Sequence, residues 1–142
     1  MGARRTGRER ALQALYQLEM GSLEPEAALE MAWASAPEEG NAKARAEART
    51  FALELVHGVA GQKVEIDRLI QEHSHNWRLD RMAKVDRSVL RVAVYELCFR
   101  QDIPKKVTLN EAVELGKRFG TEESSAFING VLDRIALAVG KP

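Results

Sequence analysis

An almost continuous block of apolar residues lies between Lys84 and Arg100, with the sequence KVDRSVLRVAVYELCFR. At 100° per residue its apolar side chains are distributed around the whole circumference of a helix, which is typical of a helix enclosed by its neighbours. The β-branched residues would also suit a strand, but the block is longer than a usual strand. We therefore predict an all-α fold in which other helices pack around this central buried helix.

Shorter segments with apolar residues at helical spacing lie on both sides of the central block. Thr6–Glu9 and Thr108–Glu111 both fit the capping-box pattern, so we expect helices to begin at Thr6 and Thr108. Thr121 is expected to cap the last helix, within which Gly130 suggests a close approach to another helix. Gly58 and Gly61 are expected to interrupt the third helix. In total we predict about seven helices.

The length of the chain and its apolar content limit the number of domains that it can form. A chain of 142 residues with 45% hydrophobic residues fits one domain with a real core. We expect two small helical subdomains, an N-terminal half over about residues 1–71 and a C-terminal half over about residues 79–142. The lone Cys98 is expected to be buried and suits a reducing compartment. Neither a membrane span nor a signal peptide is found, so we expect a cytoplasmic protein.

The charges of the chain balance overall but are unevenly distributed. There are 21 basic and 21 acidic residues, so polyanion binding would depend on local clusters. One such cluster consists of Arg4, Arg5 and Arg8, at or just before the expected start of the first helix, on chain able to move. Guanidinium groups offer forked donors for phosphate oxygens and planar faces for bases. The alternative is a terminus that only aids solubility.

Three further side chains could serve either the core or a ligand. Phe127 lies near the edge of the apolar stripe of the last helix, where an aromatic residue is usually part of the core. If exposed, it could stack on an unpaired base, and Asn129 could hydrogen-bond to a base edge or a backbone group. Tyr16 has the same ambiguity in the first helix.

The sequence contains no catalytic signature. Gly-rich phosphate loops, HExxH, paired CxxC and G-x-S-x-G motifs are all missing from it. His73 and His75 have i, i+2 spacing, which does not place two metal ligands on one helical face. We therefore expect no enzyme activity, no metal site and no cofactor.

Three blocks of the sequence carry a resemblance to a known family. They are ARRTGRERALQALYQLE, VDRSVLRVAVYEL and IPKKVTLNEAVELGKRFGTEESSAFINGVLDRIA. In order and spacing they resemble the NusB family of bacterial transcription antitermination factors, over nearly all of residues 1–142. The resemblance implies a single RNA-binding domain without catalytic activity. It also implies binding of the single-stranded boxA element in the leader RNA of ribosomal RNA operons, jointly with the ribosomal small-subunit protein NusE, within a transcribing RNA polymerase complex that contains other Nus factors.

The resemblance also implies roles for individual residues. The RNA-contacting residues of the family correspond to Arg4, Arg5, Arg8 and Phe127. Positions at which substitutions disturb antitermination or partner binding correspond to Tyr16, Asp80, Asp86 and Glu123. The chain departs from the family at Ala126, where many members have a lysine, and this departure removes one expected phosphate contact.

Two other functions fit a helical domain of this kind. One is a purely protein-binding module, including a homodimer in which Tyr16 and Phe127 are interface anchors. The other is an RNA-binding accessory domain related to the one that precedes the catalytic domain of some rRNA methyltransferases. Such an enzyme would need a cofactor-binding segment, and the sequence has none.

Overall fold

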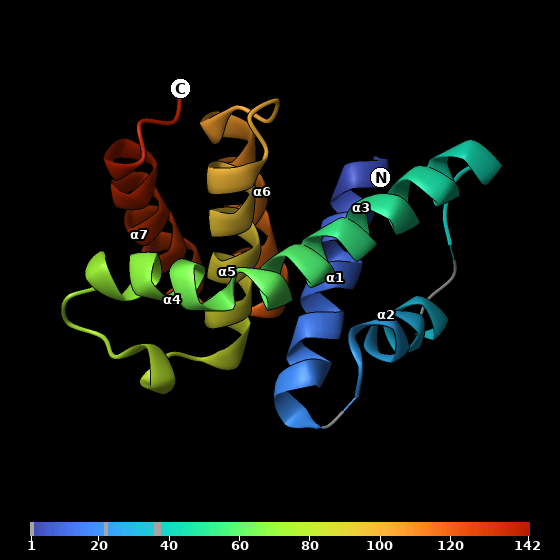
Figure 1. The fold of residues 1–142 in the computed structure, drawn as a ribbon, viewed down its shortest axis with the longest axis horizontal. Coiled ribbons are helices and arrows are strands. Elements are labelled where there is room, and N and C mark those ends of the chain that lie inside the picture. Colours follow the sequence, from blue (N-terminus) through green and yellow to red (C-terminus); the bar gives the residue numbers. More distant parts are fainter. Residues whose placement is uncertain (1, 22, 36–37) are drawn as a thin grey trace. The chain divides into compact units, whose positions relative to one another are not determined.

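The computed structural model describes residues 2–21, 23–35 and 38–142. Within these residues it contains seven α-helices, one short 3-10 helix and no strand, which confirms the all-α prediction (Figure 1). The elements in chain order are α1 (Ala3–Met20), α2 (Pro25–Ala34), α3 (Ala42–Gly61), α4 (Lys63–Glu72), η1 (Leu79–Arg81), α5 (Lys84–Phe99), α6 (Lys105–Phe119) and α7 (Ser124–Ala138).

The helices form two compact units, Met1–Gly61 and Gln62–Pro142. The division lies before α4, whereas the sequence pattern places it after that helix. The reason is that α4 packs against α5 and α7, and its buried residues Ile66, Leu69 and Ile70 belong to the core of the second unit. The two units are described separately below.

The first unit is a three-helix cluster in which α1 packs against both α2 and α3. The apolar residues at helical spacing in α2, which are Ala28, Leu29, Ala32 and Trp33, are all buried. Helices α1 and α3 pack closely at Gly7. A Cβ atom there would lie 3.0 Å from the carbonyl oxygen of Ala48 and 3.1 Å from Cδ2 of Phe51. A residue without a side chain therefore lets these two helices pack closely.

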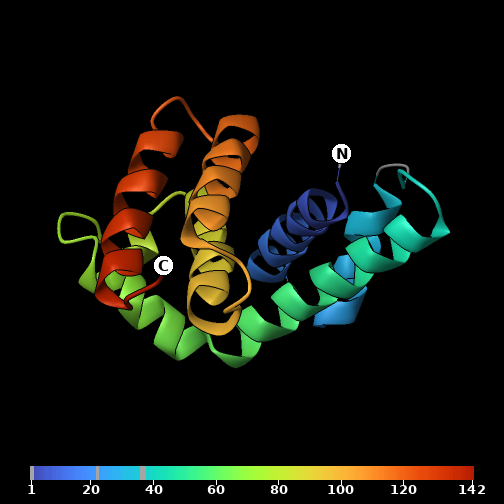
Figure 2. The same cartoon turned by 90° about the horizontal axis from the view of Figure 1, so that it is seen from above.

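The second unit is organised around α5, as the apolar block predicts. Helices α4, α6 and α7 all pack against α5, and the residues from Ser88 to Val94 are all buried. Figure 2 shows α6 and α7 running antiparallel and side by side in this unit. Enclosure ends with the last turn of α5, because Cys98 is only half-buried and Phe99 is exposed.

Buried polar contacts connect the helices of the second unit. Arg91 in α5 donates two hydrogen bonds to the carboxylate of Asp67 in α4, at 2.8 and 3.0 Å. The carboxylate of Glu96 accepts a hydrogen bond of 2.9 Å from the Thr108 hydroxyl in α6. The ammonium group of Lys141 donates to the backbone carbonyl of Arg100 at 2.6 Å. These bonds satisfy buried polar groups that apolar packing alone would leave without partners. They also fix the helices of this unit relative to one another.

The expected helix starts are wrong at all three threonines. Helix α1 begins at Ala3, and the amide of Thr6 already donates to the carbonyl of Gly2 within its first turn. Helix α6 begins directly after Pro104, so Thr108 lies one turn inside it, where its hydroxyl bonds to Glu96. The last helix begins at Ser124 rather than after a Thr121 cap.

Two glycines also differ from expectation. Gly58 does not interrupt α3, which continues to Gly61. Gly130 does not approach another helix, because the nearest atom to a Cβ built there is Nη1 of Arg134 in the same helix, at 3.6 Å. The close approach of α6 to α7 occurs instead at Gly116, where a Cβ would lie 3.0 Å from Cδ1 of Ile128.

Candidate nucleic-acid interface

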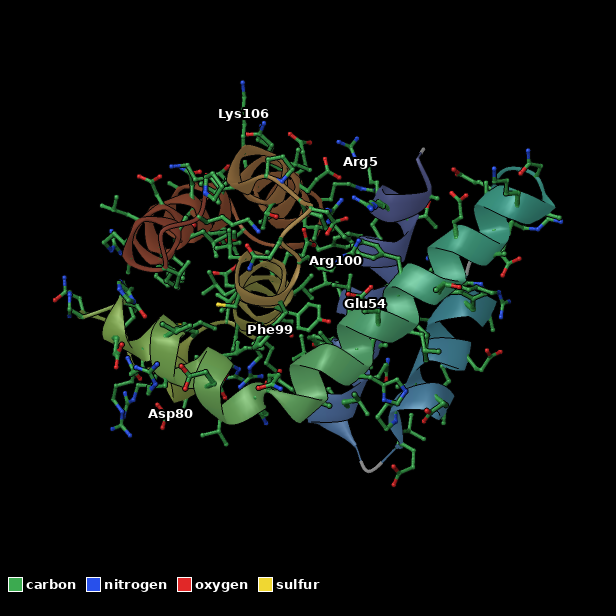
Figure 3. The ribbon with its side chains drawn as sticks, turned by 45° about the horizontal axis from the view of Figure 1, so that its top comes forward. Arg5, Glu54, Asp80, Phe99, Arg100 and Lys106 are labelled. Carbon is green, nitrogen blue, oxygen red and sulfur yellow. The ribbon has the colours of Figure 1, made fainter. Side chains whose placement is uncertain are left out.

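The N-terminal arginines lie within a helix and not on a mobile arm. Because α1 begins at Ala3, Arg4 and Arg5 occupy its first turn, and both are exposed. Figure 3 shows the Arg5 side chain projecting from this turn. Their cationic groups are therefore presented from a fixed backbone. The positive end of the helix dipole lies at the same terminus, so this end of α1 favours anions.

Arg8 lies in the core of the first unit, contrary to the expectation of a mobile residue. It is only 3% exposed, and its guanidinium carbon is 5.2 Å from the ring centroid of Phe51 in α3. The guanidinium of Arg4 lies over the same ring at 5.6 Å. Phe51 itself is 6% exposed. A cation over an aromatic face is attracted by the ring quadrupole, so these contacts stabilise the α1–α3 packing.

Tyr16 lies near the C-terminal end of the same helix. It is 36% exposed, so neither the core nor the ligand interpretation is excluded by its burial. Tyr16 and the exposed arginines are on one element of the first unit, three turns apart.

In the second unit, Phe127 forms an aromatic pair with Trp77. Phe127 is half-buried, and its ring centroid lies 6.2 Å from that of Trp77 with an interplanar angle of 76°. Trp77 is 57% exposed. Asn129 and Ala126 on the same helix are exposed as well. Phe127 is thus neither fully buried nor fully exposed.

Trp77 is the aromatic residue that sequence reasoning missed. It follows the polar segment His73–Asn76, and a tryptophan in a polar loop is a signal that could have drawn attention to it. Its partner Phe127 is fifty residues away in the chain, however, and helical periodicity says nothing about contacts at that separation.

The acidic residues expected to bind a protein partner all lie in the second unit. Asp80 in η1 is exposed, forms an ion pair of 3.1 Å with Arg78, and points away from the ribbon (Figure 3). Glu123 is exposed just before α7 and accepts a hydrogen bond of 3.1 Å from the Thr121 hydroxyl. Asp86 lies in the first turn of α5, where its Oδ1 atom is buried without a hydrogen-bond partner.

Groups that could support catalysis are not assembled in the part of the chain that the structure describes. Burial raises the pKa of the Cys98 thiol, with a further contribution from the negative charge of Glu65, so the nucleophilic thiolate is disfavoured. The Nε2 atom of His57 lies 2.7 Å from a carboxylate oxygen of Glu26. No group of three or more His, Cys, Asp or Glu side chains among the described residues could hold a metal ion. Likewise, none of the described helices is long and apolar enough to cross a membrane.

Comparison with known proteins gives one consistent result. The model of the NusB family matches residues 5–137. The transcription antitermination protein NusB of Myxococcus xanthus is 65% identical over 142 residues, covering 100% of both chains. The NusB of Geobacter sulfurreducens is 52% identical, covering 96% of this chain and 95% of its own.

Solved structures agree with the sequence comparison. A crystal form of Thermotoga maritima NusB is 41% identical, with a TM-score of 0.80, covering 94% of this chain and 90% of its own. A crystal structure of the antitermination factors NusB and NusE in complex with dsRNA contains a chain that is 26% identical, with a TM-score of 0.83, covering 96% of this chain and 97% of its own. The chain therefore belongs to the NusB family of transcription antitermination factors, which are not enzymes.

Proposed function

We propose that this chain is an adaptor that binds the single-stranded boxA element of ribosomal RNA operon leader RNA together with the ribosomal protein NusE. The joint complex then acts on transcribing RNA polymerase with other Nus factors. Family membership over residues 5–137 supports this proposal, and a related NusB crystallised with NusE and dsRNA supports binding of RNA and NusE in general. Binding of one RNA by two proteins adds the affinity of both sets of contacts.

The observation that carries the proposal is the half-exposed ring of Phe127 at the start of α7, which is paired with the exposed indole of Trp77. Base–aromatic stacking requires an accessible ring face and tolerates any base. The exposed Arg4 and Arg5 of the first unit supply phosphate contacts. Arg8 contributes less, because it is buried against Phe51, whereas Arg4 lies over the same ring but is exposed.

The acidic residues of the second unit are proposed to contact NusE. Asp80 and Glu123 are exposed, and their existing partners Arg78 and Thr121 are close neighbours in the chain. Exposed ion pairs and hydrogen bonds of this kind contribute little to folding, so these carboxylates can exchange partners at low cost. Asp86 is only partly exposed and its Oδ1 atom is buried, so it is less accessible to a docked protein than Asp80 and Glu123.

The decisive experiment is a titration of the chain with boxA RNA, a scrambled single strand and a boxA duplex, each with and without NusE. The proposal predicts the tightest binding for single-stranded boxA and a gain in affinity when NusE is present. Equal binding of boxA and the scrambled strand would contradict the proposed sequence specificity. Tighter binding of the duplex would contradict the proposed binding of single-stranded RNA. Binding of NusE without any RNA binding would favour the purely protein-binding module.

Phe127→Ala tests the residue that carries the proposal. Loss of a stacked base weakens RNA binding by about 1–3 kcal/mol, while the folded structure is kept. Leu137→Ala is the matched control, because Leu137 is an exposed apolar residue of the same helix. If the Phe127→Ala protein remains folded and binds boxA as tightly as the control, then Phe127 is a packing residue and has no RNA-binding role.

A further inference from the structure

Trp77 is an exposed aromatic side chain on a backbone that is held in place. The loop before it is fixed by the amide side chain of Gln71, which donates to the carbonyl of Trp77 at 2.9 Å and accepts from the amide of Leu79 at 2.8 Å. The amide of Trp77 also donates to the carbonyl of Ser74 at 3.0 Å. Folding alone gives no reason to fix a large apolar ring in water, since its burial would be the more stable arrangement.

The loop is also attached to α7 at Arg134, two turns after Phe127. The guanidinium of Arg134 donates from Nε and Nη2 to the carbonyl of His73, at 3.1 and 2.9 Å. Phe127 and Arg134 are seven residues apart, and Gly130 lies between them on the same face of the helix. The loop therefore crosses this face with two contacts, one at each end. These contacts fix the indole relative to the phenyl ring.

We propose that Trp77 and Phe127 together form the binding site for a single unpaired nucleobase, so that Trp77 is a second stacking residue. This inference rests on the proposed RNA-binding function and extends it to a residue that the sequence analysis did not identify. The two rings meet nearly at right angles, at 76°, and the indole remains more than half exposed. A planar base stacked on the face of one ring would present its own edge to the face of the other, and edge-to-face contact is favourable for aromatic rings.

The polar surroundings favour a nucleotide over an apolar peptide side chain. Asn76 directly precedes Trp77, and its side-chain amide is exposed. Such an amide can donate to and accept from the edge of an unpaired base. Arg78 follows Trp77, and its ion pair with Asp80 is largely exposed, so its guanidinium can exchange the carboxylate for an RNA phosphate.

The test uses the intrinsic fluorescence of the full-length chain with single-stranded boxA RNA. The chain has two tryptophans, and Trp33 is buried in the first unit, so a base stacked on an exposed indole should change the emission of Trp77. The change should be lost in Trp77→Phe, which retains an aromatic ring and most of the RNA affinity. Trp77→Ala should weaken binding by about 5- to 150-fold, the range for loss of one base stack. Leu137→Ala is again the matched control.

A double-mutant cycle and abasic RNAs locate the base. If both rings hold one base, Trp77→Ala and Phe127→Ala are non-additive, and the double variant loses little more affinity than either single variant. One abasic position in the RNA should then remove the effect of both substitutions. Thermal unfolding of each variant checks that the loss does not come from an unfolded protein.

The outcomes separate this inference from the proposed function. If the wild-type chain binds boxA while Trp77→Ala binds it equally well and the emission is unchanged, then the inference is overturned and the proposed function stands. If Trp77→Ala weakens binding of NusE but not of RNA, then Trp77 belongs to a protein interface and the inference is also overturned. If the wild-type chain binds no single-stranded RNA, then both proposals fall.

Discussion

Each unit of the chain has an aromatic site, and the two sites differ in what covers the ring. In the first unit Phe51 is buried, and the guanidinium groups of Arg4 and Arg8 lie over its face. In the second unit Trp77 and Phe127 contact each other, and the indole is left largely in solvent. An aromatic ring thus stabilises the first unit under arginine side chains, whereas in the second unit the indole remains available to a ligand.

The difference shows that the covering atoms decide the role of an aromatic residue. A ring that is already covered by cations gains little from a nucleobase, because its face is occupied. A ring held by a fixed loop but left open has no competing contact to lose when a base stacks on it. Stability and RNA affinity should therefore respond in opposite ways to substitutions at the two sites.

The largest expected effect is on stability, from Phe51→Ala. Removal of a buried phenyl ring leaves a cavity and deprives Arg4 and Arg8 of their packing surface, at a cost of about 3–5 kcal/mol in the free energy of unfolding. Trp77→Ala should cost only about 0.5–1.5 kcal/mol, the worth of its contact with Phe127. Urea unfolding followed by circular dichroism measures both. Equal losses would mean that Trp77 is a core residue, and the comparison would no longer hold.

The next effect comes from Gly7, which keeps α1 close to the Phe51 ring. In Gly7→Ala the new methyl group would lie 3.0 Å from a backbone oxygen of α3, which has little room to move. Overpacking of this kind costs about 1–3 kcal/mol. Gly61→Ala is the control in the same unit, because nothing lies within 4 Å of a Cβ built there. It should be neutral or slightly stabilising, and a loss as large as that of Gly7→Ala would contradict the close approach.

Apolar spacing predicted most of the fold because it is a local property of the sequence. The stripe of the last helix, Ile128, Val131, Leu132 and Ile135, is fully buried as expected. The helix starts could not be read in the same way. A capping pattern requires a particular backbone conformation at the threonine, and the preceding Gly2 and Pro104 allow each helix to begin earlier.

The candidate site was harder to predict than the fold. Arg4, Arg5 and Arg8 are almost adjacent in the sequence, but only the structure shows that Arg8 is directed onto Phe51. The pairing of Trp77 with Phe127 depends on the crossing of a loop over α7, and no local pattern encodes that crossing. Contacts between residues far apart in the chain decide which of the similar side chains is exposed.

Two arginines of α1 should therefore separate stability from RNA binding. Arg8→Met removes the cation over Phe51 but keeps an apolar stem, and should cost about 0.5–2 kcal/mol of stability. Arg5→Met should change stability by no more than about 0.5 kcal/mol. For RNA binding we expect the larger effect from Arg5→Met and the smaller from Arg8→Met. Arg5→Met should lower the slope of log affinity against log salt by about 0.7, the value for one phosphate contact.

The salt response is measured by titrating boxA between 50 and 200 mM salt. If the slopes of wild type and variant differ by 0.7, the ratio of their RNA affinities changes by about threefold between 50 and 200 mM salt. Arg8→Met, corrected for any unfolded fraction, should retain the wild-type slope. A loss of slope in Arg8→Met and none in Arg5→Met would show that the buried guanidinium leaves Phe51 to bind phosphate.

The smallest expected effect comes from giving the second unit the cation that it lacks beside Phe127. Ala126 is exposed in the first turn of α7, so Ala126→Lys should fold normally, with a cost of a few tenths of a kcal/mol from the unfavourable helix dipole. The new ammonium group should add one phosphate contact and steepen the salt slope by about 0.7. Ala126→Gln is the control with a similar side chain and no charge. If the Gln variant binds RNA as tightly as the Lys variant, then the gain does not come from charge. If neither variant differs from the wild type, then RNA phosphates do not pass beside this ring, and the aromatic pair acts through stacking alone.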